Sequence, residues 1–143
     1  MSAGRDAGFA LDPRIAASTL PWRDWSLSQV RLMNDRRFPW LLLVPRRAGA
    51  VEWHTLAPED QLALHQETML TACALDAVFP ALKINIGALG NVVPQLHVHV
   101  LARKPGDAAW PGPVWGAGQA EPYAVGEAEE LLARIGAVLD EKT

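Results

Sequence analysis

Two of the four histidines of this 143-residue chain lie two residues apart in the segment PQLHVHVLAR, residues 94–103. On a β-strand, alternate side chains point to the same face, so Gln95, His97 and His99 would share one face opposite an apolar one. At the usual rise per residue, neighbours on that face lie about 6.6 Å apart, which suits several polar groups around one phosphate. A neutral imidazole also has a nitrogen lone pair available for nucleophilic attack at pH 7. The segment therefore predicts a phosphate-handling site.

Two other interpretations of the histidine pair stay open. Half-exposed histidines are common structural residues on sheets, although the flanking Gln95 and the glycine-containing turn before it favour a site. The imidazoles of His97 and His99 can also chelate zinc or another divalent ion. Such a site needs a third ligand, and the sequence has no obvious motif that supplies one. Phosphate chemistry is therefore the preferred prediction, and no metal ligand is assigned.

The segments around the histidines predict a mixed fold. Residues 26–34 alternate loosely and residues 39–47 form a short apolar run, so together they predict a hairpin. Residues 57–80 predict a helix, and alternation returns in residues 81–88 and 95–103. The other expected elements are a short helix after Asp12 in an otherwise irregular segment 1–25, a Pro- and Gly-rich loop over 104–118 and a terminal helix over 126–141. This order predicts an α+β fold with an antiparallel sheet.

The long predicted helix has an apolar stripe at helical spacing. Its members are Leu62, His65, Met69, Ala72 and Cys73. We expect this stripe to face the core, with His65 as a packed residue.

Composition limits the class of protein. With half of its residues apolar and a fifth charged, the chain fits one globular domain with a substantial core. The net charge of −3 argues against general nucleic-acid binding, which relies on excess Lys and Arg. The single cysteine, Cys73, excludes an internal disulfide and a cysteine-rich zinc site. Neither a signal peptide nor a run of the ~20 apolar residues of a membrane helix is found, so we expect a cytoplasmic protein without membrane partners.

The segment QLHVHVLARKPGD, with INIGALGNVV before it, resembles the histidine triad (HIT) superfamily of nucleotide hydrolases and transferases, whose signature is His-φ-His-φ-His-φ-φ with φ apolar. It is most similar to the fragile-histidine-triad branch of dinucleoside polyphosphate hydrolases, in which Arg-Lys, one further residue and Gly-Asp follow. NDRRFPWLLLVPRR and EWHTLAPED resemble that branch's nucleoside-pocket hairpin and the start of its long helix. The similarity covers about residues 26–107.

The resemblance implies an α+β, HIT-like fold in a single domain over residues 1–143, with an extension over about 1–25 and a C-terminal loop and helix over about 104–143. It implies a five-stranded antiparallel sheet with a long helix and a C-terminal helix. It also implies a homodimer that acts on a small-molecule nucleotide, with no required cofactor and Mg²⁺ only as it arrives bound to the substrate. The expected reaction is cleavage of nucleoside di- or polyphosphates, of the diadenosine polyphosphate type, through a nucleotidyl-histidine intermediate.

The family's site residues correspond to positions in this chain. The nucleophilic histidine falls on His97. The third signature histidine falls on His99, which would hydrogen-bond the phosphate and stabilise developing charge. The loop that faces the phosphates falls on Asn91, Val92 and Val93, whose backbone N–H groups would be donors.

Two asparagines complete the implied nucleotide site. Asn85 matches a family asparagine near the phosphates, and Asn34 matches a polar residue that bonds the ribose hydroxyls. Either one can equally be a turn or strand-edge residue.

The chain departs from the family pattern at two of the family's four histidines. Gln95 replaces the first signature histidine and Trp40 replaces an upstream histidine on the hairpin, whereas His54 matches a structural histidine before the long helix. Glutamine donates and accepts hydrogen bonds but cannot become a cation. We therefore expect slow turnover or a need for good leaving groups, because lost general-acid catalysis costs about 10² to 10⁴ in rate. An inactive nucleotide-binding or regulatory protein of the same fold is the first alternative, and a metal-binding protein is the second.

The segment after the histidines carries Trp110 and Trp115 in a Pro- and Gly-rich loop. These side chains are expected to close over the base or to reach a partner subunit, since aromatic residues are enriched at interfaces. A rigid surface loop is the alternative. Four cations at strand ends are candidates for an outer phosphate, although such charges are most often solvated: Arg46, Arg47, Arg103 and Lys104.

Overall fold

The computed structural model describes residues 6–79 and 83–141. Its elements in chain order are α1 (Pro13–Ser18), β1 (Thr19–Asp24), β2 (Ser28–Met33), β3 (Trp40–Pro45), the short 3₁₀ helix η1 (Trp53–Thr55), α2 (Pro58–Val78), β4 (Lys83–Gly87), β5 (Val98–Arg103) and α3 (Glu127–Glu141). The strands form a five-stranded sheet in the order β1-β2-β3-β5-β4, and each neighbouring pair is antiparallel. The predicted α+β fold with a five-stranded antiparallel sheet, a long helix and a C-terminal helix is confirmed.

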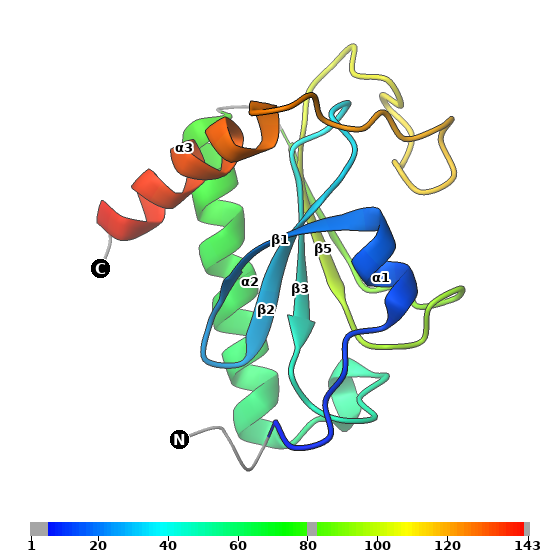
Figure 1. Ribbon diagram of the computed structural model, residues 1–143, viewed down its shortest axis with the longest axis vertical. Helices are drawn as coiled ribbons and strands as arrows, with labels where there is room; N and C mark the ends of the chain where they lie inside the picture. Colours follow the sequence, from blue (N-terminus) through cyan, green and yellow to red (C-terminus); the bar gives the residue numbers. More distant parts are fainter. Residues whose placement is uncertain (1–5, 80–82, 142–143) are drawn as a thin grey trace.

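Helices α2 and α3 pack on one face of the sheet, and α1 lies on the other face (Figure 1). Strand β2 shows the alternation of a strand with one well-covered face, because Ser28, Val30 and Leu32 are buried and the residues between them are half-buried. Strands β3 and β5 are buried along their whole length, since they lie in the middle of the sheet under both layers. The two histidines of the motif therefore belong to the best-covered part of the molecule.

The layer opposite α2 is assembled from segments far apart in the sequence. Ile15 of α1 and Val114 of the loop after β5 join Trp40, Leu42 and other sheet residues in one apolar cluster. Side chains of the segment before α1 and of the loop pack against the same cluster. This layer, and not the α2 layer, surrounds the histidine side chains.

The sequence-based element bounds are largely correct, with one strand missed. Residues 19–24 were expected to be irregular but form β1, which pairs with β2. The register shifts between Pro21 and Arg23, and this irregularity breaks the alternation that would identify a strand. The start of the strand predicted over 81–88 and the proline expected to end the long helix, Pro80, lie outside the described residues.

Strand β5 begins at Val98, three residues later than predicted. Gln95 and His97 therefore precede the strand, and only His99 of the three polar residues belongs to it. The expectation that all three side chains line one strand face is wrong for Gln95, whose contacts are described below.

The expected orientation of the long helix is wrong. Leu62 is 57% exposed and Met69 is 39% exposed, and His65 and Cys73 are also exposed. The buried side chains of α2 are Asp60, Leu64, Glu67, Thr68, Thr71, Ala74 and Leu75.

Polar partners explain how this mixed face of α2 is buried. The carboxylate of Asp60 accepts two hydrogen bonds from Arg47, at 2.7 and 3.0 Å, and Glu67 accepts the backbone N–H of Leu27 at 3.0 Å. The hydroxyls of Thr68 and Thr71 donate to carbonyls four residues earlier. Apart from Glu67 Oε1, which has no hydrogen-bond partner among the described residues, these groups are paired and can be buried at little cost, so apolar periodicity alone did not identify the inward face. No helix in the described ranges is long and apolar enough to cross a membrane.

Candidate active site

The side chain of His97 is fixed by its own backbone segment. Its Nδ1 lies 2.6 Å from the carbonyl oxygen of Gln95. A carbonyl oxygen can only accept, so Nδ1 must carry the proton and donate it. In the neutral ring, Nε2 then has the free lone pair. His97 is only 9% exposed, so its ring is held in a largely enclosed position that suits a nucleophile.

His99 is held in the opposite tautomer. The indole Nε1–H of Trp40 donates to Nδ1 of His99 over 3.0 Å. Because Nδ1 accepts, the proton of the neutral ring is on Nε2, which can donate to a ligand. Burial, followed by the nearby charge of His97, lowers the pKa of His99 from 6.5 to about 3. His99 is therefore a neutral hydrogen-bond donor near pH 7 and not a cation.

The two imidazoles sit together in an aromatic enclosure. Their ring centroids are 4.9 Å apart in an edge-on arrangement, and Trp40 and Trp115 lie 5.6 and 5.4 Å from His99. Gly87 pairs with His99 across β4 and β5, and a Cβ atom there would come within 3.0 Å of the Trp115 ring. The loop after β5 thus covers His99 within the same chain, and glycine leaves the space for it.

Gln95 contacts the N-terminal arm, which we define as residues 6–12. Its Oε1 accepts the backbone N–H of Asp12 at 2.8 Å, and its Nε2 donates to the carbonyl of Ala10 at 2.9 Å. Both polar atoms of the amide are therefore bonded to main-chain groups of the arm. The geometry assigns Gln95 a structural contact that sequence reasoning missed, since its partners are 83 and 85 residues away along the chain.

The loop predicted to face the phosphates lies beside the histidines. Asn91 and Val92 are exposed, and Val93 packs on the apolar cluster that contains Trp40. The guanidinium of Arg14 donates to the carbonyl of Val92 at 3.1 Å. The roles of these loop residues toward a ligand stay predictions.

The two predicted asparagines use their carbonyl oxygens within the protein. Asn34 Oδ1 accepts the backbone N–H of Tyr123 at 3.0 Å, and Asn85 Oδ1 accepts Nη1 of Arg103 at 2.9 Å. The Asn34 contact fixes the segment before α3, and the Asn85 contact joins β4 to the end of β5, so each agrees with the structural interpretation left open for that residue. Their ligand roles stay predictions.

Three of the four cations considered for an outer phosphate are already paired. Arg46 and Arg47 bind Asp6 at 3.1 and 3.0 Å. Arg103 is 2% exposed and binds Asp107 through two hydrogen bonds of 2.7 and 2.9 Å. These bonds, more than any other influence, lower the pKa of Asp107 to about 2. Arg103 is thus neither solvated nor available to a phosphate, and it fixes the loop that carries Trp115.

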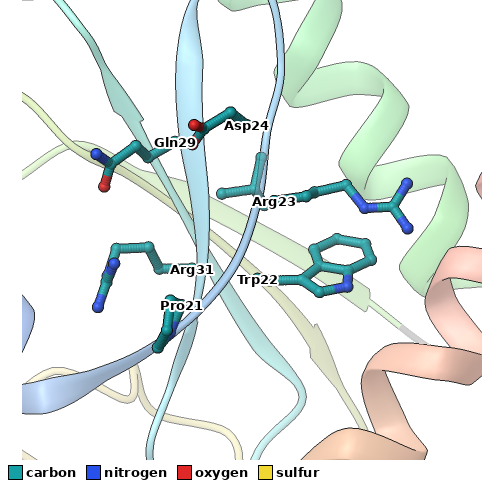
Figure 2. Close-up of a pocket in the computed structure, with 7 residues that line it drawn as sticks. Pro21, Trp22, Arg23, Asp24, Gln29 and Arg31 are labelled. Atoms are coloured by element: carbon teal, nitrogen blue, oxygen red, sulfur yellow. The ribbon is translucent and has the colours of Figure 1, made fainter.

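Two further observations delimit the site. A cavity of about 310 Å³ lies on the β1–β2 hairpin, where Gln29 and Arg31 extend to one side and Trp22 to the other (Figure 2). None of the predicted site residues lines it. In the described part of the chain, no group of three or more His, Cys, Asp or Glu side chains could hold a metal ion. The histidine pair with its tryptophans is therefore the best candidate for chemistry.

Comparison with known proteins gives concordant similarities. The family model described as HIT domain matches residues 24–106, more than half of the chain. A histidine triad protein from Sinorhizobium meliloti 1021 is 53% identical, with 90% of this chain and 96% of that chain covered and a TM-score of 0.89. One from Bradyrhizobium japonicum is 42% identical, with 91% and 97% covered and a TM-score of 0.88. One from Marinobacter aquaeolei VT8 is 39% identical, with 96% and 100% covered and a TM-score of 0.91. No curated protein matches this chain.

Proposed function

This chain belongs to the histidine triad family, and from that premise we propose that it cleaves nucleoside di- or polyphosphates as a hydrolase or nucleotidyl transferase. Members of the family generally bind nucleotides or act on their phosphoanhydride bonds. The proposed substrates are of the diadenosine polyphosphate type, as in the fragile-histidine-triad branch. The observation that carries the proposal is the hydrogen bond from Nδ1 of His97 to the Gln95 carbonyl, which in the neutral ring leaves the lone pair on Nε2 and fixes the ring as a nucleophile.

The proposed reaction has two displacement steps. In the first, the Nε2 lone pair of His97 forms a bond to the α-phosphorus, and the bond from phosphorus to the bridging oxygen breaks with its electron pair on the leaving phosphate. In the second, a water oxygen attacks the same phosphorus and releases a proton to solvent, the N–P bond breaks, and the ring regains its lone pair. A hydroxyl acceptor in place of water would make the reaction a transfer. Nε2–H of His99 donates to a non-bridging oxygen and stabilises its growing negative charge.

The composition of the site favours substrates whose leaving group is itself acidic. Gln95 cannot carry a proton to the leaving oxygen, Trp40 stands where a further histidine would be, and His99 is neutral with a pKa of about 3. Departure of a phosphate group needs little protonation, whereas departure of an amine or alkoxide needs a general acid. Phosphoanhydrides therefore suit this site better than esters or amides with basic leaving groups.

We propose that the remaining nucleotide contacts follow the family pattern. Asn91, Val92 and Val93 would offer backbone N–H groups to the phosphates, and Asn34 and Asn85 would contact the ribose and the phosphates. No cofactor is assigned, and Mg²⁺ would arrive only with the nucleotide. A cytoplasmic location is part of the same proposal.

A homodimer is also proposed, and the surface supports it. Leu62, Met69 and Cys73 form an exposed stripe on α2. Strand β4 lies at the end of the strand order, and its Ile86 is 42% exposed. Exposed apolar side chains on a helix and an open sheet edge are typical of surfaces covered by a partner.

One set of assays tests the proposed function. Purified protein is incubated with labelled dinucleoside polyphosphates, and turnover is compared among the wild type, His97→Ala and His97→Asn, with bound metal measured in parallel. We expect nucleotide cleavage that both substitutions abolish. Tight nucleotide binding without turnover would instead indicate a binding protein. Stoichiometric zinc that is lost on replacement of His97 or His99 would indicate a metal site.

A further inference from the structure

The N-terminal arm is fastened to the body of the protein at both ends. At its start, Asp6 binds the guanidinium groups of Arg46 and Arg47 at 3.1 and 3.0 Å. At its end, Gln95 bonds the main chain of Ala10 and Asp12 at 2.9 and 2.8 Å. The second attachment lies two residues from His97, so the arm is held directly beside the proposed nucleophile.

The last residue of the arm, Asp12, forms an ion pair with Arg14 of α1. The carboxylate of Asp12 caps α1 and accepts Nε and Nη2 of Arg14 at 3.1 and 3.0 Å. The backbone N–H of Asp12 is bonded to Gln95, whose own carbonyl accepts from the His97 ring, so the pair is linked to the imidazole through one residue. Nη1 of Arg14 reaches the Val92 carbonyl, in the loop beside the histidines. Sequence reasoning did not single out Asp12 or Arg14 as site residues.

Arg14 still has hydrogen-bonding capacity for a ligand. A guanidinium has five N–H donors, and Arg14 uses one on each of its three nitrogens in the contacts given above. Its side chain is 57% exposed. Arg103, by contrast, is almost fully buried, and Arg46 and Arg47 are 13% and 14% exposed beside their carboxylate partners. Among these four arginines, Arg14 is the exposed one, and it is bonded to the segments on either side of Gln95 that the arm and the loop provide.

Arg14 joins two segments that flank the motif, because it bonds Asp12 of the arm that Gln95 holds and Val92 of the loop before the histidines. In phosphoryl transfer, the attacking atom and the leaving oxygen lie roughly in line on opposite sides of phosphorus. A leaving group that extends from the buried His97 toward solvent would come within reach of Arg14, which is exposed. The carboxylate of Asp12 does not prevent Arg14 from binding an anion, because the opposite charges of the two side chains leave no net negative charge to repel it.

We propose that Arg14 binds a phosphate of the leaving group, and that Gln95 is a positioning residue that holds the arm so that Arg14 is in place. This inference rests on the proposed function and deepens it. It makes the anionic leaving portion, beyond the attacked phosphorus, a determinant of specificity. It also gives Gln95 a role that requires no proton transfer.

The first test compares two substrates of the same nucleoside. One is the dinucleoside polyphosphate, whose leaving group carries phosphates, and the other is the 4-nitrophenyl ester of the nucleoside monophosphate, whose leaving group is acidic but has none. Arg14→Gln should lower kcat/KM at least about tenfold more for the polyphosphate than for the aryl ester, as expected for loss of charged hydrogen bonds. Equal losses for the two substrates would overturn the assignment of Arg14 to the leaving group.

Arg36→Gln is the matched control for Arg14. Arg36 binds Glu127 through Nε and Nη2 at 3.2 and 3.1 Å, and its side chain is 50% exposed, so it has the same kind of exposed carboxylate pair. It lies at the turn between β2 and β3, and its partner is on α3. Arg36→Gln should change kcat/KM by the same factor for the two substrates. If it lowers kcat/KM for the polyphosphate selectively, as much as Arg14→Gln does, the effect is one of general surface charge and the proposal is overturned.

The second test measures the arm without relying on turnover. In Gln95→Ala, hydrogen exchange of the Asp12 amide should speed up at least about tenfold, because its hydrogen bond is lost. The control is Gln61→Ala, since the Gln61 amide bonds the carbonyls of His54 and Leu56 away from the arm. Gln95→Ala should also lower kcat/KM more for the polyphosphate than for the aryl ester, as Arg14→Gln does. The double variant should lose no more kcat/KM for the polyphosphate than either single variant. Unchanged exchange, or a loss that is additive with Arg14→Gln, would contradict the positioning role.

Titration with pyrophosphate separates failure of this inference from failure of the proposed function. Wild-type protein should bind pyrophosphate at least about tenfold more tightly than Arg14→Gln. If no nucleotide is cleaved but this difference is found, the proposed reaction fails and the anion site stands. If nucleotides are cleaved through His97 but both variants bind pyrophosphate equally, the reaction stands and the role of Arg14 is wrong.

Discussion

The indole N–H of Trp40 donates to Nδ1 of His99 over 3.0 Å, and this single bond sets the tautomer of a buried imidazole. In Trp40→Phe, Nδ1 loses its donor, and the ring becomes free to carry its proton on either nitrogen. We expect imidazole ¹⁵N spectra to change from the Nε2–H form of His99 to a mixture, together with a lower kcat. Leaving a buried acceptor unpaired should also cost about 1–3 kcal/mol in the free energy of unfolding.

Trp115→Phe is the control for this prediction. Trp115 contacts the same imidazole at 5.4 Å, but its Nε1 has no hydrogen-bond partner among the described residues. The His99 tautomer should therefore be the same as in the wild type. A pure Nε2–H form in Trp40→Phe as well would show that something other than Trp40 sets the tautomer.

The low pKa of His99 makes stability depend on pH. The pKa is about 3 in the folded protein and about 6.5 when the chain is unfolded, so between these values the unfolded state binds a proton that the folded state does not. The free energy of unfolding should therefore fall as pH decreases from 6.5 toward 3, by at most about 5 kcal/mol from this group. Urea titrations of the wild type and His99→Gln would show a shallower fall in the variant. If the free energy of unfolding depends on pH in the same way in both proteins, the low pKa does not belong to His99.

The ion pair of Arg103 and Asp107 should be a major contribution to the loop after β5. Removal of one partner leaves an uncompensated buried charge, so Arg103→Met should destabilise the protein by about 3–5 kcal/mol. Since the pKa of Asp107 is about 2 when folded and 3.8 when unfolded, this stabilisation is present above pH 3.8 and is lost as pH falls toward 2. Chemical denaturation at pH 7 measures the first effect, with the exposed Arg36→Gln as control. A loss no larger than that of the control would show that the pair is not structural.

How far the sequence predicts this molecule depends on the distance along the chain over which residues interact. The hairpin of β2 and β3 was predicted from local periodicity, whereas β1 was missed because Pro21 and the register shift after it interrupt the pattern. The inward face of α2 was assigned wrongly because Asp60 and Glu67 find their partners on distant segments.

The candidate site shows the same division. His97 and His99 were identified from their spacing, and the structure brings them together at a ring separation of 4.9 Å. The contacts of Gln95 with the arm span 83 and 85 residues, and the bond between Trp40 and His99 spans 59. Such contacts leave no periodic signal in the sequence, so only the fold could reveal them.

The exposed stripe on α2 predicts an effect on assembly. If Leu62 lies in a homodimer interface, Leu62→Asp places a charge in that interface and should yield a 15.5 kDa monomer at micromolar concentration. Sedimentation of wild type and variant measures this, with Val125→Asp, at a fully exposed apolar position away from α2, as control. A monomeric wild type, or a variant that still dimerises, would show that the stripe is not an interface.

The most direct test of the central claim is to trap the intermediate on His97. Protein mixed briefly with a dinucleoside polyphosphate, quenched in alkali and digested should yield a peptide that carries one nucleoside monophosphoryl group on His97, and His97→Asn should neither carry the group nor cleave the substrate. Cleavage at an undiminished rate by His97→Asn, or turnover of the wild type with the group never found on His97, would contradict the account.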